Sequence, residues 1–389
     1  KGNRPADGGR GEPDMRDRLI KLLKKPMTGI LISVLIGFIV GAVVLAVAGY
    51  NPLEAYGAMF AGMFRKPKYV SQIVINAVPI ILTGLSVSFA YKSGLFNIGA
   101  EGQYMIGTVT AALVGRYFLL PMGVHPAVVL LLAFLFGGLF GGLAGWLKAR
   151  FGVHEVISTI MLNWIALYFN NFILTLPGVK KPGSQASYEV ADTAKLLFLG
   201  DWKKSEAGKE FIKSNAFWGD FLRTDLHWGI LLALVVVLLA WYYLNHTTKG
   251  FELRAVGANK DAAEFAGIGV KKNMVMAMFI SGGIAALAGA IQILGTNPFR
   301  ISVLPVTEGY GWDGISVSLI ANNNPLGCVL SGLLFSGLKY GGGSIQSEIG
   351  APSEIINIMI GSIVFCVALV SIYPMIAERL KRRGGSHVE

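Results

Sequence analysis

Residues 274–296 read MVMAMFISGGIAALAGAIQILGT, an apolar run without a charged side chain. Because about 20 apolar residues in a helix cross the roughly 30 Å of hydrocarbon in a bilayer, this run predicts a transmembrane helix. Runs of the same kind and of similar length occupy residues 27–50, 70–91, 127–147, 156–176, 228–245 and 355–377. The sequence therefore predicts an all-α, polytopic transmembrane helical bundle.

The low charge of the chain agrees with a membrane protein. Of the 389 residues, 53% are hydrophobic and only 15% are charged, whereas soluble proteins carry about 25% charged residues. The net charge of +11 does not indicate binding to nucleic acid, because the basic residues lie mostly between the apolar runs. Cys328 and Cys366 both lie inside apolar runs, so the sequence offers neither a disulfide framework nor a CxxC site.

Two segments predict interrupted spans. Glu101 and Arg116 bracket a short uncharged run, 102–115, and the run 314–338 is interrupted by Asn322, Asn323, Asn324 and the helix breaker Pro325. The second run therefore predicts two helical pieces, 312–321 and 325–340. With these pieces the count is about ten spans, one of them short or broken. An even count places both basic termini in the cytoplasm, as the positive-inside rule requires.

The same rule divides the chain into regions. Residues 1–26 form a basic cytoplasmic segment whose first part has a disordered composition, and residues 378–389 form a basic cytoplasmic tail. Residues 27–176 and 228–377 form two transmembrane halves. The nearly neutral segment 177–227 is an extracytoplasmic cap, and the loop 246–273 is cytoplasmic. Arg65, Lys66 and Lys68 fall on the outer side and are an exception to the rule.

The sequence carries no catalytic constellation. It lacks the GxxxxGK[ST] motif that holds nucleotide phosphates, and His154-Glu155 is not followed by the second His of a zinc-binding HExxH helix. Serine and aspartate residues near the spans have no base in a recognisable register. We therefore expect a protein that is not an enzyme and that binds neither a metal nor a cofactor of its own.

The loop 246–273 predicts a short amphipathic helix. Asn259 can cap the helix, and Gly267 or Gly269 can end it. Ala262, Phe265 and Ala266 form its apolar face. Because so short a helix is unstable alone in water, it needs a surface on which to dock. The spacing favours the membrane surface and a groove on a cytoplasmic partner equally.

A longer pattern in this loop favours docking on a cytoplasmic partner. The loop contains GxxxRAxGxNxxAAxxxGI, here Gly250, Arg254, Ala255, Gly257, Asn259, Ala262, Ala263, Gly267 and Ile268. This pattern resembles the coupling loop of permease subunits in ABC importers of the branched-chain amino acid, simple sugar and nucleoside superfamily. The resemblance implies a helix from Asn259 to Gly267 that docks on an ATPase subunit. Phe265 would be its apolar anchor, and Glu252, Arg254 and Glu264 its orienting charges.

Further segments are similar to the nucleoside branch of this superfamily. They read GLFNIGAEGQ at 94–103, EVISTIMLNW at 155–164 and, at the second polar break, GYGWDGISVSLIANNNPLG at 309–327. The resemblance implies the longer of two non-identical permeases, which pair as a heterodimer in a bacterial plasma membrane. It also implies cytoplasmic ATPase subunits that bind ATP and Mg²⁺, and an extracytoplasmic nucleoside-binding protein or lipoprotein.

Polar side chains at the two breaks are the predicted substrate pathway. Asn97, Glu101 and Gln103 at the first break offer donors and acceptors that suit a ribose or a nucleobase edge. Asn322 and Asn323 offer the same at the second break. Helix packing explains these groups as well.

Two further side-chain assignments have alternatives. Asn163 shares a helix face with Asn170 and Asn171, and this face suits either interhelical hydrogen bonds or the pathway. Glu101 could instead pair with Lys92 or Arg116.

Two other functions stay open beside a nucleoside importer. A monosaccharide importer needs a similar polar lining, because a nucleoside carries a ribose. A secondary transporter or a channel would also be polytopic, but it is expected to place acids or histidines within its spans, and the long runs here carry no charge. The main prediction is therefore an ABC importer permease for nucleosides.

Overall fold

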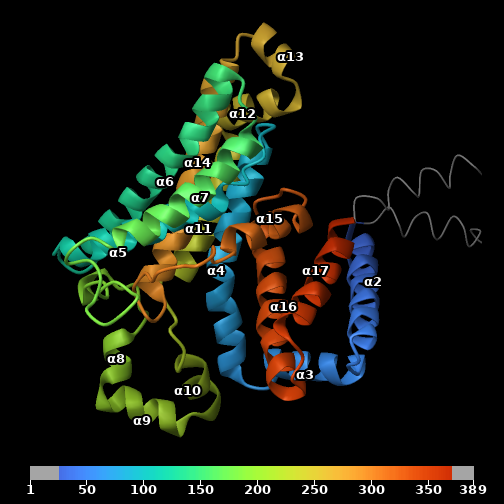
Figure 1. The fold of residues 1–389 in the computed structure, drawn as a ribbon, viewed down its shortest axis with the longest axis vertical. Coiled ribbons are helices and arrows are strands. Elements are labelled where there is room, and N and C mark those ends of the chain that lie inside the picture. Colours follow the sequence, from blue (N-terminus) through green and yellow to red (C-terminus); the bar gives the residue numbers. More distant parts are fainter. Residues whose placement is uncertain (1–25, 370–389) are drawn as a thin grey trace, which may run out of the picture. The chain divides into compact units, whose positions relative to one another are not determined.

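The computed structural model describes residues 26–369. The regular secondary structure in these residues consists of α-helices and one short 3₁₀ helix (Figure 1). The expectations for residues 1–25 and for the tail 378–389 lie outside the described residues. The described chain divides into two compact units. The smaller unit combines residues 26–55 and 351–369, and the larger unit comprises residues 56–350.

Two helices make up most of the smaller unit. In it, α2 (Pro26–Val47) packs against α17 (Ser353–Ala368). Gly37 allows their close approach, since an added Cβ would lie 2.8 Å from the Cα of Ile363. The run 27–50 and the described part of the run 355–377 are thus largely helical, as predicted.

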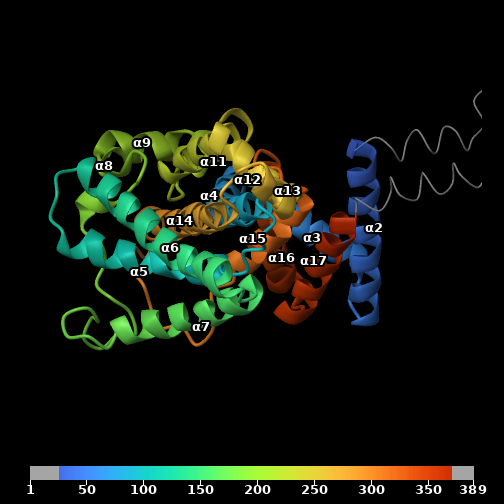
Figure 2. The same cartoon turned by 90° about the horizontal axis from the view of Figure 1, so that it is seen from above.

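The larger unit is organised around α14 (Val270–Gly295), which packs against α6 (Val124–Phe151), α5 (Ala100–Tyr117) and α4 (Pro67–Tyr91) (Figure 2). Glycines set the contact between α6 and α14. An added Cβ at Gly141 would collide with the carbonyl oxygen of Met278, and one at Gly282 would collide with that of Gly137. Helices inside membranes commonly associate in this way, because small residues let their backbones approach.

Five helices of the described chain are long and apolar enough to cross a membrane, or up to six if a bent helix pair counts as one span. The five are α4, α6, α7 (Glu155–Ile173), α11 (Gly229–His246) and α14. They coincide with predicted runs, so the all-α, multi-pass membrane fold is confirmed. The count of about ten spans and the cytoplasmic position of the termini stay predictions.

One predicted interruption is present, because the Asn-rich segment separates α15 (Tyr310–Ile320) from α16 (Gly327–Ile349). The other predicted segment, bracketed by Glu101 and Arg116, is a continuous helix of 18 residues, α5. Asn322 and Asn323 have φ of 50° and 54°, a left-handed conformation that asparagine adopts more readily than most residues. The break therefore follows from the residue types at this position.

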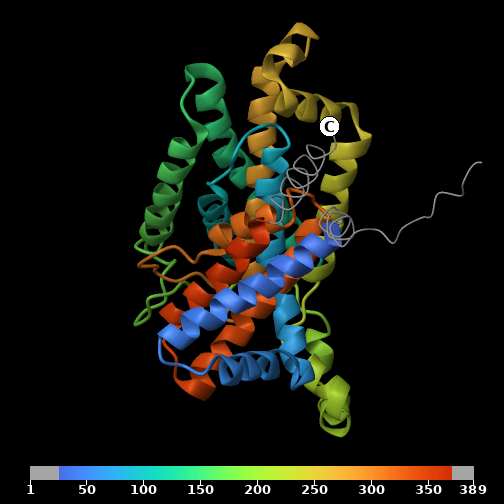
Figure 3. The ribbon, with the colours of Figure 1, turned by 90° about the vertical axis from the view of Figure 1, so that its right-hand side faces the viewer.

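Several short helices were not predicted. They are α3 (Pro52–Phe64), α12 (Thr248–Ala258), and α8 (Gly200–Lys204), α9 (Glu206–Ser214) and α10 (Ala216–Leu222) of the cap segment 177–227, with a 3₁₀ turn η1 (Asp192–Ala194) before them. The cap contacts the start of α4, where the Ser71 and Thr224 hydroxyls lie 2.5 Å apart. Figures 1 and 3 show α8–α10 and α13 (Lys260–Phe265) at opposite ends of the larger unit.

Candidate functional site

The loop 246–273 forms two helices with well-defined caps. The Thr247 hydroxyl accepts a hydrogen bond from the Gly250 amide at 3.0 Å and begins α12. The Asn259 side chain accepts one from the Ala262 amide at 3.0 Å and begins α13. Gly267, with φ of +80°, follows the end of α13. The predicted cap and stop of this helix are confirmed.

The tip of α13 presents apolar side chains to the outside. Phe265 is 97% exposed, and Ala262 and Ala266 beside it are also exposed. Ala263, which lay outside the predicted apolar face, is the residue that packs inward, at 4% exposure. Because Phe265 contributes almost nothing to packing within the chain, its apolar area is free for a partner.

Helix α12 ties this tip to the membrane helices. Glu252 accepts hydrogen bonds from Lys249 at 2.6 Å and from Asn273 of α14 at 3.2 Å, and these bonds lower the pKa of Glu252. Gly257 lies against the backbone of Lys92, directly after α4. Arg254 and Glu264 are exposed. Their role as orienting charges, like that of Glu252, stays a prediction.

A cavity of about 610 Å³ joins this loop to the turn between α6 and α7. Lys148, Gly152, Glu264 and Lys272 are among the residues that line it. The loop 246–273 and the turn between α6 and α7 therefore lie together at one end of the larger unit.

The predicted pathway residues near the first break form a buried hydrogen-bonded cluster. Asn97 and Gln103 are both 0% exposed. The Asn97 amide donates to Gln103 Oε1 and to Ser281 Oγ of α14, each at 2.7 Å. Asn163 accepts from the Gly102 amide at 2.8 Å and donates to the Ile98 carbonyl at 3.0 Å. These bonds join α5, α7 and α14 to the loop that follows α4. Contact of these residues with substrate stays a prediction.

Glu101 has partners that the sequence did not indicate. Its carboxylate, 0% exposed, accepts hydrogen bonds from the backbone amides of Gly309 at 2.7 Å and Gly311 at 2.5 Å. A pairing with Lys92 or Arg116 is therefore wrong for this structure. A carboxylate at the first turn of a helix satisfies free amides and complements the helix dipole. Glu101 thus fixes the start of α15.

The residues of the second break differ in exposure. Asn323 is 6% exposed, and its side chain accepts a hydrogen bond from the Ser318 hydroxyl at 2.8 Å. Asn322 is exposed. The two residues do not share one environment, and their place in the pathway stays a prediction.

Sequence reasoning missed a cavity of about 460 Å³ between α4, α15 and α16. It is lined by Asn76, Ile80, Tyr310, Ser336, Lys339, Tyr340, Gly343 and Ser344. Tyr310 lies in the motif at 309–327, and this was the available signal. Its partners on α4 and α16 are distant in sequence.

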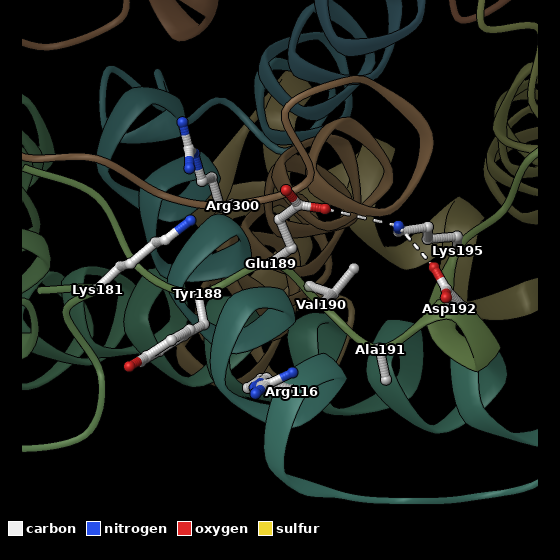
Figure 4. A pocket seen from close by; sticks show the side chains of 9 residues that line it. All are labelled: Arg116, Lys181, Tyr188, Glu189, Val190, Ala191, Asp192, Lys195 and Arg300. Atoms are coloured by element: carbon white, nitrogen blue, oxygen red, sulfur yellow. Dashed lines mark hydrogen bonds and ion pairs between the residues drawn. The ribbon is translucent and has the colours of Figure 1, made fainter. Parts of the chain in front are cut away.

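A further cavity, of about 340 Å³, is strongly basic (Figure 4). It is lined by Arg116, Lys181, Tyr188, Glu189, Val190, Ala191, Asp192, Lys195 and Arg300, most of them in the cap segment. Lys195 lies 2.7 Å from Asp192 and 3.7 Å from Glu189, and its hydrogen bond lowers the pKa of Asp192.

The remaining cations of this basic cavity have no acidic partner in the described part of the chain. Among the described residues, no carboxylate lies within ion-pair distance of Arg116, Lys181 or Arg300. The Arg116 guanidinium lies over the Tyr188 ring, 5.3 Å from its centroid. The cavity can therefore hold a carboxylate or a phosphate, the groups that guanidinium binds most strongly.

The described residues thus combine a helix bundle that can span a membrane, a buried polar cluster and an exposed apolar side chain, Phe265, at the tip of α13. Residues 69–369 match the family described as branched-chain amino acid transport system / permease component, and the chain belongs to this family. It is accordingly a non-catalytic transport subunit.

Several curated relatives align with nearly the whole chain. The guanosine ABC transporter permease protein NupP of Bacillus subtilis is 38% identical over 92% of this chain and 97% of its own length. The nucleoside ABC transporter permease protein NupB of Lactococcus lactis is 30% identical over 90% of this chain and 93% of its own. The glucose ABC transporter permease protein TsgB13 of Haloferax volcanii is 31% identical over 90% and 87%. No solved structure matches the chain.

Proposed function

We propose that this chain is a permease subunit of a nucleoside ABC importer and forms part of its translocation pathway. The observation that carries the proposal is the 38% identity with a permease named for guanosine, over nearly the full length of both chains. The exposed Phe265 at the tip of α13 supports ATP-driven coupling through a docked partner. Monosaccharide import is the second candidate, because a relative named for glucose is 31% identical.

The partners follow from this assignment. Bacillus subtilis has two permeases named for guanosine, NupP and NupQ, which are 38% and 26% identical to this chain. Since two non-identical permeases are named for the same substrate, this chain is expected to form a heterodimer with a second, non-identical permease. Cytoplasmic ATPase subunits would dock on α13 and would hold ATP and Mg²⁺, while this chain binds no cofactor. An extracytoplasmic nucleoside-binding protein or lipoprotein would deliver the substrate.

The docking of α13 on ATPases sets the orientation of the chain in a bacterial plasma membrane. The loop 246–273 lies in the cytoplasm, and the cap segment 177–227 lies outside. About ten spans with both termini in the cytoplasm remain our proposal for the topology.

Uptake of radiolabelled guanosine by cells with and without this chain tests the substrate class. We expect uptake that depends on the chain and that excess uridine inhibits, while ribose and a branched-chain amino acid do not. Inhibition by ribose and not by uridine would favour the monosaccharide candidate. Guanosine uptake that is the same without the chain would remove the nucleoside assignment.

We further propose that the basic cavity of the cap contacts acidic side chains of the binding protein. Arg300→Glu reverses one of its unpaired charges, and we expect it to weaken binding of that protein about tenfold or more and to reduce the salt dependence of association. Lys213→Glu, an exposed charge reversal on α9 of the same cap, is the matched control. Equal affinities of both variants for the binding protein, measured with the assembled transporter in nanodiscs, would contradict this role.

A further inference from the structure

The cavity between α4, α15 and α16 combines aromatic rings with small polar groups, and both rings are held in place. The Tyr310 carbonyl accepts a hydrogen bond from the Thr83 hydroxyl of α4 at 2.8 Å. The Tyr310 ring lies against the Tyr104 ring, with 5.1 Å between centroids. Because Glu101 binds the amides on either side of Tyr310, the backbone at this position is fixed from two helices.

The second ring of the cavity comes from α16. Tyr340 lies against Tyr69, with 5.9 Å between ring centroids. Nearby, the Ser336 hydroxyl donates to the Ile73 carbonyl of α4 at 2.7 Å, which joins α16 to α4. The two cavity tyrosines are therefore presented by helices that are bonded to a common neighbour, and little ordering is needed when a planar ligand binds.

The lining carries almost no net charge. Lys339 is the lining residue with a basic side chain, and its ammonium lies 2.5 Å from Asp313 Oδ2. Asn76 accepts a hydrogen bond from Gln72 at 3.0 Å, and its own amide hydrogens have no protein partner among the described residues. A neutral ligand with hydroxyl or carbonyl groups suits this lining better than an anion does. In this respect the cavity differs from the basic one in the cap.

We propose that this cavity binds the nucleoside during its passage, with the base against the Tyr310 and Tyr340 rings and with Asn76 and Lys339 near its polar groups. Its volume of about 460 Å³ lies within the roughly 300–1,000 Å³ typical of sites for small molecules. Aromatic rings bind nucleobases by stacking. The inference rests on the proposed function and names the part of the chain that contacts substrate.

Gly343 allows the cavity to be filled with little disturbance of the fold. An added Cβ at Gly343 meets no atom within 4 Å. The same is true of Gly57 on α3, which is also exposed and lies outside the cavity. Gly343→Leu and Gly57→Leu therefore form a matched pair, in which only the first places a side chain in the proposed site.

The test measures ATP-driven guanosine uptake into proteoliposomes that contain the complete transporter with its binding protein. We expect at least a tenfold loss of uptake in Gly343→Leu and wild-type uptake in Gly57→Leu. Tyr340→Ala is expected to lose about tenfold in kcat/KM, whereas Tyr340→Phe keeps most of it, because the ring supplies the stacking. Co-purification of the ATPase subunits with each variant shows that it is assembled.

Two results would overturn the inference, and they can be told apart. If the wild-type transporter carries guanosine and both Gly343→Leu and Tyr340→Ala carry it equally well, the cavity is not on the pathway although the proposed function holds. If the wild-type transporter carries no guanosine but carries a monosaccharide, the proposed function fails, and the assignment of a nucleoside to this cavity fails with it.

Discussion

Phe265→Asp is expected to abolish transport and leave the membrane bundle folded. Phe265 is 97% exposed, so its replacement removes almost no packing within the chain. In the assembled transporter, an apolar groove on an ATPase subunit would cover the ring. Loss of a buried phenylalanine costs about 1.5–3 kcal/mol, and a carboxylate in the same groove adds the cost of its desolvation. Together these two costs correspond to a more than hundredfold loss of affinity for the ATPase subunit.

The measurement for Phe265 has two parts, co-purification of the ATPase subunits and ATP-driven uptake. Phe265→Leu is the control, because leucine keeps an apolar side chain at the tip of α13 and is expected to retain most of the activity. Phe265→Asp that transports at the wild-type rate would remove the docking assignment. An unchanged unfolding temperature of the purified chain would show that the loss is one of assembly.

Glu101→Ala is expected to destabilise the larger unit. The substitution leaves the amides of Gly309 and Gly311 without their acceptor, and each unsatisfied buried donor costs about 1–3 kcal/mol. The expected loss is therefore about 2–6 kcal/mol in the free energy of unfolding. Because α15 would lose its anchor, Tyr310 would also lose its fixed position, and guanosine uptake should fall.

Thermal unfolding of the detergent-solubilised protein measures this effect. Glu101→Gln keeps one acceptor oxygen and is expected to lose less stability than Glu101→Ala. The alternative is the role predicted from the sequence, in which Glu101 belongs to the substrate pathway. If Glu101→Ala unfolds at the wild-type temperature but loses uptake, then Glu101 contacts substrate directly.

Properties that depend on a local run of residues were predictable from the sequence. Residues 274–295 of the predicted span 274–296 lie within α14, and the cap residue Asn259 begins α13, because run length and capping are properties of neighbouring residues. The break at Asn322 and Asn323 was predictable for the same reason. Helix α3 was missed because it has only 13 residues, too few for a span, and α12 was missed because it has almost no apolar periodicity.

Contacts between distant segments could not be predicted. Glu101 and its partner Gly309 lie 208 positions apart, and the cavity joins Asn76 of α4 to Tyr340 of α16. In a water-soluble helix, polar residues mark the outer face. In a membrane helix both lipid and protein interior are apolar, so the sequence gives little information on which faces meet.

The glycine contact between α6 and α14 has a mechanical consequence. With 26 residues and about 1.5 Å of rise per residue, α14 is about 39 Å long, and α6 braces its backbone directly. One end of α14 follows α13, and at the other end the Leu294 carbonyl accepts a hydrogen bond from Leu196 of the cap segment at 2.8 Å. The pair therefore forms a stiff connection between α13 and the cap segment. If an ATPase subunit docks on α13 as proposed, a force on α13 would reach the cap as a displacement of both helices, without unwinding either of them.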